Sequence, residues 1–354
     1  MKGNEAIAEA AIRAGCTAYF GYPITPQNEL IAYMADKLTP MGRVFIQAES
    51  EVAAINMVYG AASTGVRAMT SSSSPGISLK QEGISYAAGA DLPLVYVNIS
   101  RGGPGLGSIA PAQGDYFQST RGGGHGDYKV IVLAPASVQE AADLTYLAFD
   151  LADKWRMPVL ILGDGVIGQM MEAITLPPMR SLSSLPDNCS WAVGGMYKTT
   201  PVRAAHHVSS INLVPAELEA QIFARFERYA RVAEEETRAE ALFCDDADVV
   251  IVAYGTSARV SLGAMEMARK AGLRVGLFRP VSLWPFPEAA LAKIASRKGT
   301  ELVCVEMSMG QMVQDVRLAV KDSVPVHSLI HTGGVVPSEE EVFEKCKKII
   351  GGKK

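Results

Sequence analysis

Short apolar runs that alternate with helical patterns constrain the fold of this chain more than any other feature. Runs predicted to be strands lie at 17–21, 43–47, 66–70, 94–99, 129–134 and 158–163. Most of them are apolar throughout, which is typical of strands in a parallel sheet that helices cover on both faces. Helical patterns lie between the runs, notably at 50–64 and at 136–154, where Ser137 and Glu140 form a capping-box pattern. The sequence therefore predicts a doubly wound, mostly parallel α/β domain.

A second set of apolar runs follows a change in composition. The segment 176–240 begins rich in Pro, Ser and Gly and ends in a charged helix predicted at 216–236, so it is interpreted as a linker and connecting helix. Further strands are predicted at 246–255, 274–280, 300–308 and 326–334. We therefore expect an N-terminal domain at 1–175 and, after the linker, a smaller α/β domain at 241–354.

Composition and charge exclude several classes of protein. The chain has 354 residues, and 33 basic against 37 acidic side chains give a formal net charge of −4. We expect no binding of nucleic acid, because there is no basic field to hold it. No apolar run approaches the roughly 18 residues of a membrane span, and the first residues do not have the pattern of a signal peptide. The five cysteines are scattered, which predicts a reducing cytoplasm and no metal or iron–sulfur site on this chain.

The loops after the strands are the candidates for chemistry, because ligands of α/β folds bind at the carboxyl ends of the strands. The first loop, GYPITP at 21–26, places prolines on both sides of Ile24-Thr25. Pro26 suits the first position of a helix, so Thr25 is predicted to be the N-cap of the helix that follows. This corner could be a simple turn, or it could direct a hydroxyl toward a ligand.

Three later loops carry polar residues at the same edge. Glu49 and Glu51 stand at the start of the helix at 50–64, which is apolar on nearly every face and is therefore predicted to be buried. The helix dipole stabilises a first-turn carboxylate by about 0.3–1 kcal/mol, and this accounts for one glutamate better than for two. The serines of SSSSPG could cap a helix or form a wall against a flat ligand. Arg101, in a loop of glycines, could form a surface ion pair or clamp a carboxylate.

Two motifs resemble known cofactor sites but do not meet their requirements. The glycines at 103–108 only approximate the dinucleotide pattern GxGxxG, and the acidic residue of that pattern is missing. The triplet GDG at 163–165, followed by Asn188, imitates the magnesium-diphosphate signature of thiamine enzymes. Its spacing is short, and the segment between does not have the expected helix and strand. We interpret GDG as a turn at the end of a strand.

With GYPITP, QAESEVAA and ISRGGPG in this order, the chain resembles the alpha subunits of 2-oxoacid:ferredoxin oxidoreductases over essentially its whole length. GNEAIAEAAIRAGC and SSSSPGISLKQEGISY look most like the branched-chain (2-ketoisovalerate, 3-methyl-2-oxobutanoate) branch. The resemblance implies a thiamine diphosphate-binding pyrimidine domain followed by a transketolase C-terminal-like domain. The implied reaction converts a 2-oxoacid, coenzyme A and oxidised ferredoxin to acyl-coenzyme A, carbon dioxide and reduced ferredoxin.

The same resemblance assigns roles to residues. Glu51 maps to the catalytic glutamate that binds N1′ of the aminopyrimidine, and Thr25 and Arg101 map to residues that hold the substrate. Glu49 and Asp115 are expected to support the site from behind. The residues implied in cofactor binding are Tyr22, Pro23, Ile24, Glu51, Ser73, Ser74 and Pro75.

The family also implies partners. A beta subunit would carry the diphosphate, Mg²⁺ and in many members iron–sulfur clusters, next to a gamma subunit and a ferredoxin-like delta subunit, with ferredoxin as electron acceptor. One alternative is the pyrimidine-domain subunit of a lipoamide-dependent 2-oxoacid dehydrogenase, and another is a pyruvate- or 2-oxoglutarate-specific member of the same family. A more distant alternative is a flavodoxin-type binding module. The sequence does not determine the 2-oxoacid, the direction of the reaction or the number of partner subunits.

Overall fold

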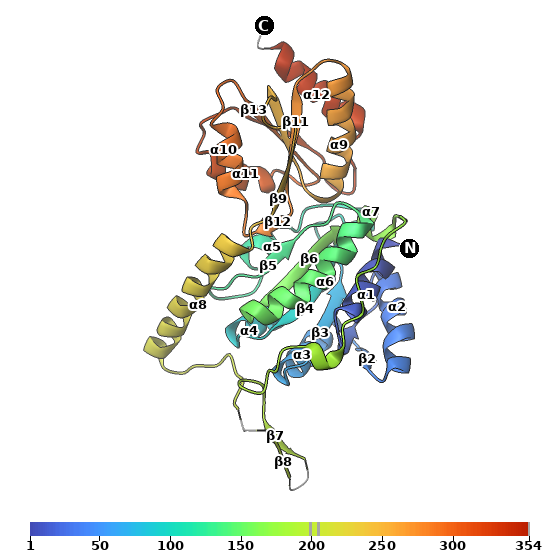
Figure 1. Ribbon diagram of the computed structural model, residues 1–354, viewed down its shortest axis with the longest axis vertical. Helices are drawn as coiled ribbons and strands as arrows, with labels where there is room; N and C mark the ends of the chain where they lie inside the picture. Colours follow the sequence, from blue (N-terminus) through green and yellow to red (C-terminus); the bar gives the residue numbers. More distant parts are fainter. Residues whose placement is uncertain (198–199, 204–205, 353–354) are drawn as a thin grey trace.

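Two sheets form the body of the protein in a computed structural model that describes residues 1–197, 200–203 and 206–352 (Figure 1). The first sheet has seven strands in the order β12-β5-β6-β4-β3-β1-β2, and the second has five in the order β14-β13-β10-β11-β9. The strands are β1 (Ala18–Gly21), β2 (Val44–Gln47), β3 (Ala68–Ser72), β4 (Leu94–Ser100), β5 (Ile131–Leu133), β6 (Pro158–Asp164), β7 (Gly195–Tyr197), β8 (Thr200–Arg203), β9 (Ala239–Leu242), β10 (Val249–Val252), β11 (Val275–Pro280), β12 (Ser282–Trp284), β13 (Glu301–Glu306) and β14 (Val326–Ile330). The helices are α1 (Gly3–Arg13), α2 (Asn28–Leu38), η1 (Thr39–Met41), α3 (Glu51–Ser63), α4 (Ser74–Gly89), α5 (Tyr116–Arg121), α6 (Val138–Trp155), α7 (Gly165–Gln169), η2 (Leu182–Ser184), α8 (Pro215–Glu235), α9 (Gly255–Lys270), α10 (Glu288–Ala295), α11 (Met312–Val320) and α12 (Glu339–Gly351).

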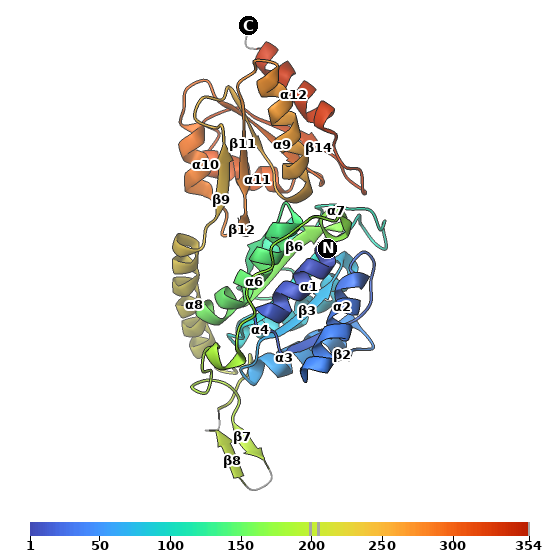
Figure 2. The same ribbon diagram turned by 45° about the vertical axis from the view of Figure 1, so that its right-hand side comes forward.

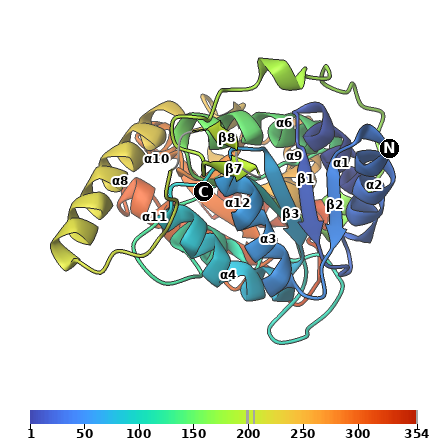
Figure 3. The same ribbon diagram turned by 90° about the horizontal axis from the view of Figure 1, so that it is seen from below.

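Helices cover both faces of the first sheet, as the sequence predicts. On β4, Leu94 and Tyr96 pack with α3 and α4, whereas Val95 and Val97 pack on the opposite face with α1, α2 and α6. Strands β1 to β6 pair with one another only in parallel. Figure 3 shows α3 and α4 side by side on one face of this sheet. The doubly wound α/β prediction is confirmed.

Four short strands are not predicted from the sequence. Strand β12 belongs to the C-terminal part of the chain but pairs antiparallel with β5, at the edge of the first sheet. Strand β9 pairs antiparallel with β11, and β7 and β8 form a hairpin that projects from the body (Figure 1). These strands have only three or four residues each, too few to show a hydrophobic period.

The start of α2 corrects the prediction for the GYPITP corner. The helix begins at Asn28 with Gln27 as its N-cap, so Thr25 does not cap it. The Thr25-Pro26 peptide is cis, and the fully buried Gln27 side chain accepts a hydrogen bond from Ser71 Oγ at 2.5 Å. The chain is therefore held against the sheet for two more residues before the helix starts. By contrast, Ser137 caps α6 by accepting the Glu140 amide, as predicted.

Two apolar segments are less covered than their sequences indicate. Strand β2 lies at the edge of the sheet, and Ile46 is 41% exposed. Helix α3 is buried along one side only, and Val52 on its other side is 42% exposed. The prediction that α3 is buried all round is therefore wrong for this chain alone.

Figure 2 shows the second sheet beyond the end of the first sheet at which β6 leads into α7. Buried polar contacts join these two parts of the chain. Gln113 donates to Tyr254 O at 2.9 Å and accepts from Ser257 Oγ and Met307 N, each at 2.9 Å. Asp164 of the GDG triplet caps α7 and accepts from Thr256 Oγ1 at 2.8 Å, so this triplet is the strand-ending turn that was predicted. None of the helices in the described part of the chain has the length and apolar composition to cross a membrane.

Candidate active site

Glu51 is the first residue of α3 and lies at the carboxyl edge of the first sheet. Ser50 caps the helix by accepting the Ala53 amide at 3.2 Å, which fixes the direction in which Glu51 leaves the backbone. Only 6% of Glu51 is exposed, and within the described residues its carboxylate accepts one hydrogen bond, a long one of 3.5 Å from Ser72 Oγ. Glycine is required at position 76, because a Cβ there would lie 2.8 Å from Glu51 Cγ. Glu51 is therefore a buried, weakly paired carboxylate packed against the first turn of α4.

Arg101 follows β4 and is brought next to the GYPITP corner. Its Nη1 donates to Thr25 O at 2.8 Å, while its Nε has no partner among the described residues. The arginine is 8% exposed, and Thr25 is exposed to solvent. The structure thus brings together the two residues to which the resemblance assigns the substrate, although they meet through the backbone of Thr25.

Asp115 braces the base of this loop. It accepts hydrogen bonds from Ser74 Oγ at 2.5 Å, Asn98 Nδ2 at 2.8 Å and Ser100 Oγ at 3.1 Å. Ser74 Oγ also accepts from the Arg101 amide at 3.0 Å. The carboxylate therefore ties the start of α4 to the end of β4, behind the arginine.

Several buried polar atoms on β3, α4 and β4 and directly after β3 and β4 have no partner in the described structure. They are Thr70 Oγ1, Ser73 Oγ, Lys80 Nζ, Asn98 Oδ1 and Arg101 Nε. Buried polar groups in folded proteins are nearly always paired, so a concentration of exceptions indicates a site that binds something polar.

The elements that carry these residues also expose apolar side chains. Tyr22, Val52 and Leu79 are exposed beside Thr25, Glu51 and Lys80 in the sequence. In the loop after Arg101, Leu106 is 83% exposed, and Ile109 is also exposed. Exposed apolar side chains around a polar site are typical of surfaces that another protein covers.

Other predicted residues lie elsewhere or play smaller parts. Glu49 is exposed and accepts a long hydrogen bond of 3.5 Å from the hydroxyl of its neighbour Ser50. Pro23 is exposed, and Ile24 and Pro75 are half-buried at the same edge. Lys80 and Asn98 are not among the site residues predicted from the sequence. Gly76 and Lys80 are four residues apart and therefore lie on one face of the helix, which is the sequence pattern that points to Lys80.

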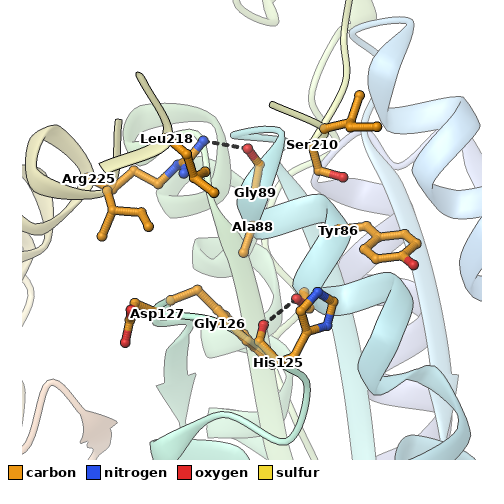
Figure 4. A pocket seen from close by; sticks show the side chains of 13 residues that line it. Tyr86, Ala88, Gly89, His125, Gly126, Asp127, Ser210, Leu218 and Arg225 are labelled. Carbon is orange, nitrogen blue, oxygen red and sulfur yellow. Dashed lines mark hydrogen bonds between the residues drawn. The ribbon is translucent and has the colours of Figure 1, made fainter. Parts of the chain in front are cut away.

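A separate hollow of about 470 Å³ lies at the far end of α4 (Figure 4). It is lined by Tyr86, His125, Asp127 and Arg225, among others. Arg225 already donates to Asp91 and to the carbonyl of Gly89, and Ser85 Oγ donates to His125 O. Its arginine is therefore paired, and the hollow lies at the opposite end of α4 from Gly76, against which Glu51 packs.

Family models and curated relatives identify the class of protein to which this chain belongs. Residues 9–201 match the family model described as pyruvate flavodoxin/ferredoxin oxidoreductase, thiamine diphosphate-binding, and residues 247–342 match pyruvate:ferredoxin oxidoreductase core domain II. Ketoisovalerate oxidoreductase subunit VorB of Methanothermobacter thermautotrophicus is 50% identical over 99% of this chain and 97% of its own length. The chain therefore belongs to the 2-oxoacid:ferredoxin oxidoreductase family, which is a family of oxidoreductases.

Solved structures confirm the fold. The 2-oxoglutarate:ferredoxin oxidoreductase from Magnetococcus marinus, with 2-oxoglutarate, coenzyme A and succinyl-CoA bound, superposes with a TM-score of 0.85 at 27% identity. The match covers 99% of this chain, which spans 65% of the solved one. A split-gene transketolase gives a TM-score of 0.63 at 15% identity, over 100% of this chain and 99% of its own, and shows the fold alone. The predicted pyrimidine-domain fold with a transketolase C-terminal-like domain is thus confirmed.

The residues present fit the aminopyrimidine end of thiamine diphosphate. A weakly paired carboxylate and the unpaired Ser73 hydroxyl lie together at the sheet edge, where a ring with donor and acceptor nitrogens could bind. In the described residues, no group of three or more His, Cys, Asp or Glu side chains is arranged to hold a metal ion.

Proposed function

We propose that this chain is the pyrimidine-binding subunit of an enzyme that oxidises a branched-chain 2-oxoacid with coenzyme A, giving acyl-coenzyme A, carbon dioxide and reduced ferredoxin. The substrate class is supported by 50% identity to a ketoisovalerate oxidoreductase subunit over nearly the whole chain. Identity to the 2-oxoglutarate enzyme of known structure is 27%. Activity with a branched-chain 2-oxoacid should therefore be compared with activity with pyruvate and 2-oxoglutarate.

The observation that carries the proposal is the buried, weakly paired carboxylate of Glu51. Thiamine diphosphate, when bound, supplies an electron sink at C2 of its thiazolium ring. Glu51 would hold N1′ of the aminopyrimidine and share a proton at Oε. Because the carboxylate has no strong partner of its own, its hydrogen-bonding capacity is available for this role.

Arg101 and Thr25 would bind the carboxylate of the 2-oxoacid. Arg101 is nearly buried and its Nε is unpaired, so the guanidinium retains donors for a charge-assisted hydrogen bond. Its hydrogen bond to Thr25 O holds the arginine beside the threonine hydroxyl. Ser73, Ser74 and Pro75, with Tyr22, Pro23 and Ile24, would shape the walls around the ring. Asp115 would support them from behind, and the exposed Glu49 lies beside Glu51 in the sequence.

A partner subunit would complete the site. The exposed Tyr22, Val52 and Leu106 support a protein contact at this edge. We propose that a beta subunit supplies the diphosphate and Mg²⁺ site and any iron–sulfur cluster, within an assembly that also contains gamma and ferredoxin-like delta subunits. Such an assembly would act in the cytoplasm.

The test is Glu51→Gln in the complex assembled from co-expressed subunits. Activity is measured as coenzyme A-dependent viologen reduction with 3-methyl-2-oxobutanoate, pyruvate and 2-oxoglutarate, without lipoyl protein. The turnover number should fall by about 10²–10⁴-fold, the range for loss of a positioned acid–base group. Thermal unfolding and subunit composition should remain those of the wild type. Glu266→Gln, the same change on the exposed face of α9, is the matched control. Near-normal turnover by Glu51→Gln would refute the assignment.

A further inference from the structure

A fully buried lysine lies beside the carboxylate of the proposed site. Lys80 of α4 has no exposed surface, and its Nζ has no hydrogen-bond partner among the described residues. An ammonium in this setting is unfavourable because water solvates it far better. Burial lowers the pKa of Lys80 to about 8, and the charge of Glu51 acts in the opposite direction. The fold thus contains a buried cation that no structural contact explains.

The position of Lys80 on its helix directs it toward Glu51. Gly76, four residues earlier, packs against Glu51, and a Cβ at Gly83, three residues later, would lie 2.6 Å from Ile55 Cγ1. Residues three or four apart share one face of a helix, so Lys80 lies on the face of α4 that packs on α3. Helical side chains also lean toward the N-terminus of their helix, which here is the end beside Glu51.

The other titratable groups around this contact are neutral or engaged elsewhere. On β4, burial raises the pKa of Tyr96 well above its ordinary value, so the phenol is uncharged. Asp115 accepts three hydrogen bonds from the β4 edge and the start of α4. Glu82 of α4 is exposed and accepts from Tyr86 Oη at 2.7 Å. Glu51 is therefore the carboxylate with which the Lys80 charge interacts.

We propose that Lys80 is a positioning residue that holds Glu51 turned toward the open side of the site. This inference rests on the proposed function, because Lys80 acts only through Glu51. The attraction between the buried ammonium and the carboxylate would orient Glu51, whose hydrogen bond from Ser72 Oγ is long at 3.5 Å. A methionine of similar length would fill the same space without the cost of burying a charge, so stability alone does not require a lysine here.

The experiment compares Lys80→Met with Lys80→Arg in the assembled complex. Loss of the cation in Lys80→Met should lower the turnover number tenfold or more and leave KM for the 2-oxoacid near the wild-type value. This split follows because Glu51 is misplaced while Arg101 keeps its contacts. Lys80→Arg keeps the cation and should keep the turnover number near that of the wild type.

Thermal unfolding of the same complexes gives a readout independent of activity. Because the folded lysine loses its proton near pH 8 and the unfolded one near 10.5, wild-type stability should rise with pH across this window relative to Lys80→Met. At pH 7, Lys80→Met should unfold at a higher temperature than the wild type.

The outcomes separate this inference from the proposed function. If Glu51→Gln is inactive but Lys80→Met keeps the wild-type turnover number, the role of Lys80 is overturned and the proposed function stands. A Lys80→Met complex that is less stable at pH 7, with kcat and KM unchanged, would show that the lysine is structural. An active Glu51→Gln complex would overturn the function itself.

Discussion

Each of the two sheets of this protein has a buried glutamate at its carboxyl edge, and the two carboxylates differ in their partners. Glu306, at the end of β13, accepts from Ser308 Oγ at 2.5 Å and from the amides of Gln311, Met312 and Val313 at 2.9–3.2 Å. The carboxylate of Glu51, at the start of α3, has one hydrogen bond of 3.5 Å within the described residues. The same residue type in the same kind of fold is thus fully satisfied in one place and nearly unsatisfied in the other.

This difference extends to the other polar groups at the edges of the two sheets. At the edge of the second sheet, the hydroxyls of Thr256 and Ser257 bond to the first domain, and Glu306 caps α11. At the edge of the first sheet, Ser73 and Arg101 keep unpaired buried atoms. The polar groups at the edge of the second sheet therefore stabilise the fold, whereas those at the edge of the first sheet are available to bind a ligand.

The largest expected effect of a substitution at these two sheet edges is a decrease in the free energy of unfolding. Glu306→Gln removes the charge that several amides share and should destabilise the protein by on the order of 3 kcal/mol, since hydrogen bonds to charged groups are the strong ones. Chemical denaturation of the full chain measures this change, with Glu266→Gln as the exposed control in the same domain. Equal losses of stability in Glu306→Gln and Glu51→Gln would contradict the conclusion that Glu306, but not Glu51, stabilises the fold.

A smaller effect is expected in substrate binding from Arg101→Lys. Lysine keeps the charge but loses the planar fork of donors, so KM for the 2-oxoacid should rise about ten- to hundredfold, with a lesser change in kcat. Steady-state kinetics of the complex provides the measurement. Arg279→Lys is the matched control, because Arg279 is equally buried but pairs with Glu140 and Glu240. It should change stability and leave KM as in the wild type.

The smallest effect is expected where the second domain touches the loop of Arg101. Gly334 has φ +107°, and a Cβ there would collide with Ala110 Cβ. Gly334→Ala should cost about 1 kcal/mol in stability through backbone strain and raise KM a few-fold by displacing the loop. Gly333→Ala has similar strain at φ +67° but meets no atom within 4 Å, so its KM should not change. Equal KM values for both variants would show that the contact does not position Arg101.

Much of the fold could be predicted, because continuous apolar runs between helical patterns leave few alternatives to a parallel sheet. The approach of Arg101 to Thr25 could not be predicted from spacing, since it depends on how loops after different strands meet. The N-cap at Thr25 was predicted wrongly, because local preference ignored the burial of Gln27 against Ser71. Lys80 was missed because a lysine in a helix is usually a solvated residue, and its burial follows only from the packing of α4 on α3.

The contacts of Gln113 have a consequence for how the two halves of the chain can separate. One buried amide is bonded to three groups of the C-terminal domain, and it lies two residues before Asp115. Rotation of one domain away from the other would break all three bonds at once and leave buried polar groups without partners, which is costly. The arrangement in which the two halves are joined is therefore favoured over one in which they swing apart.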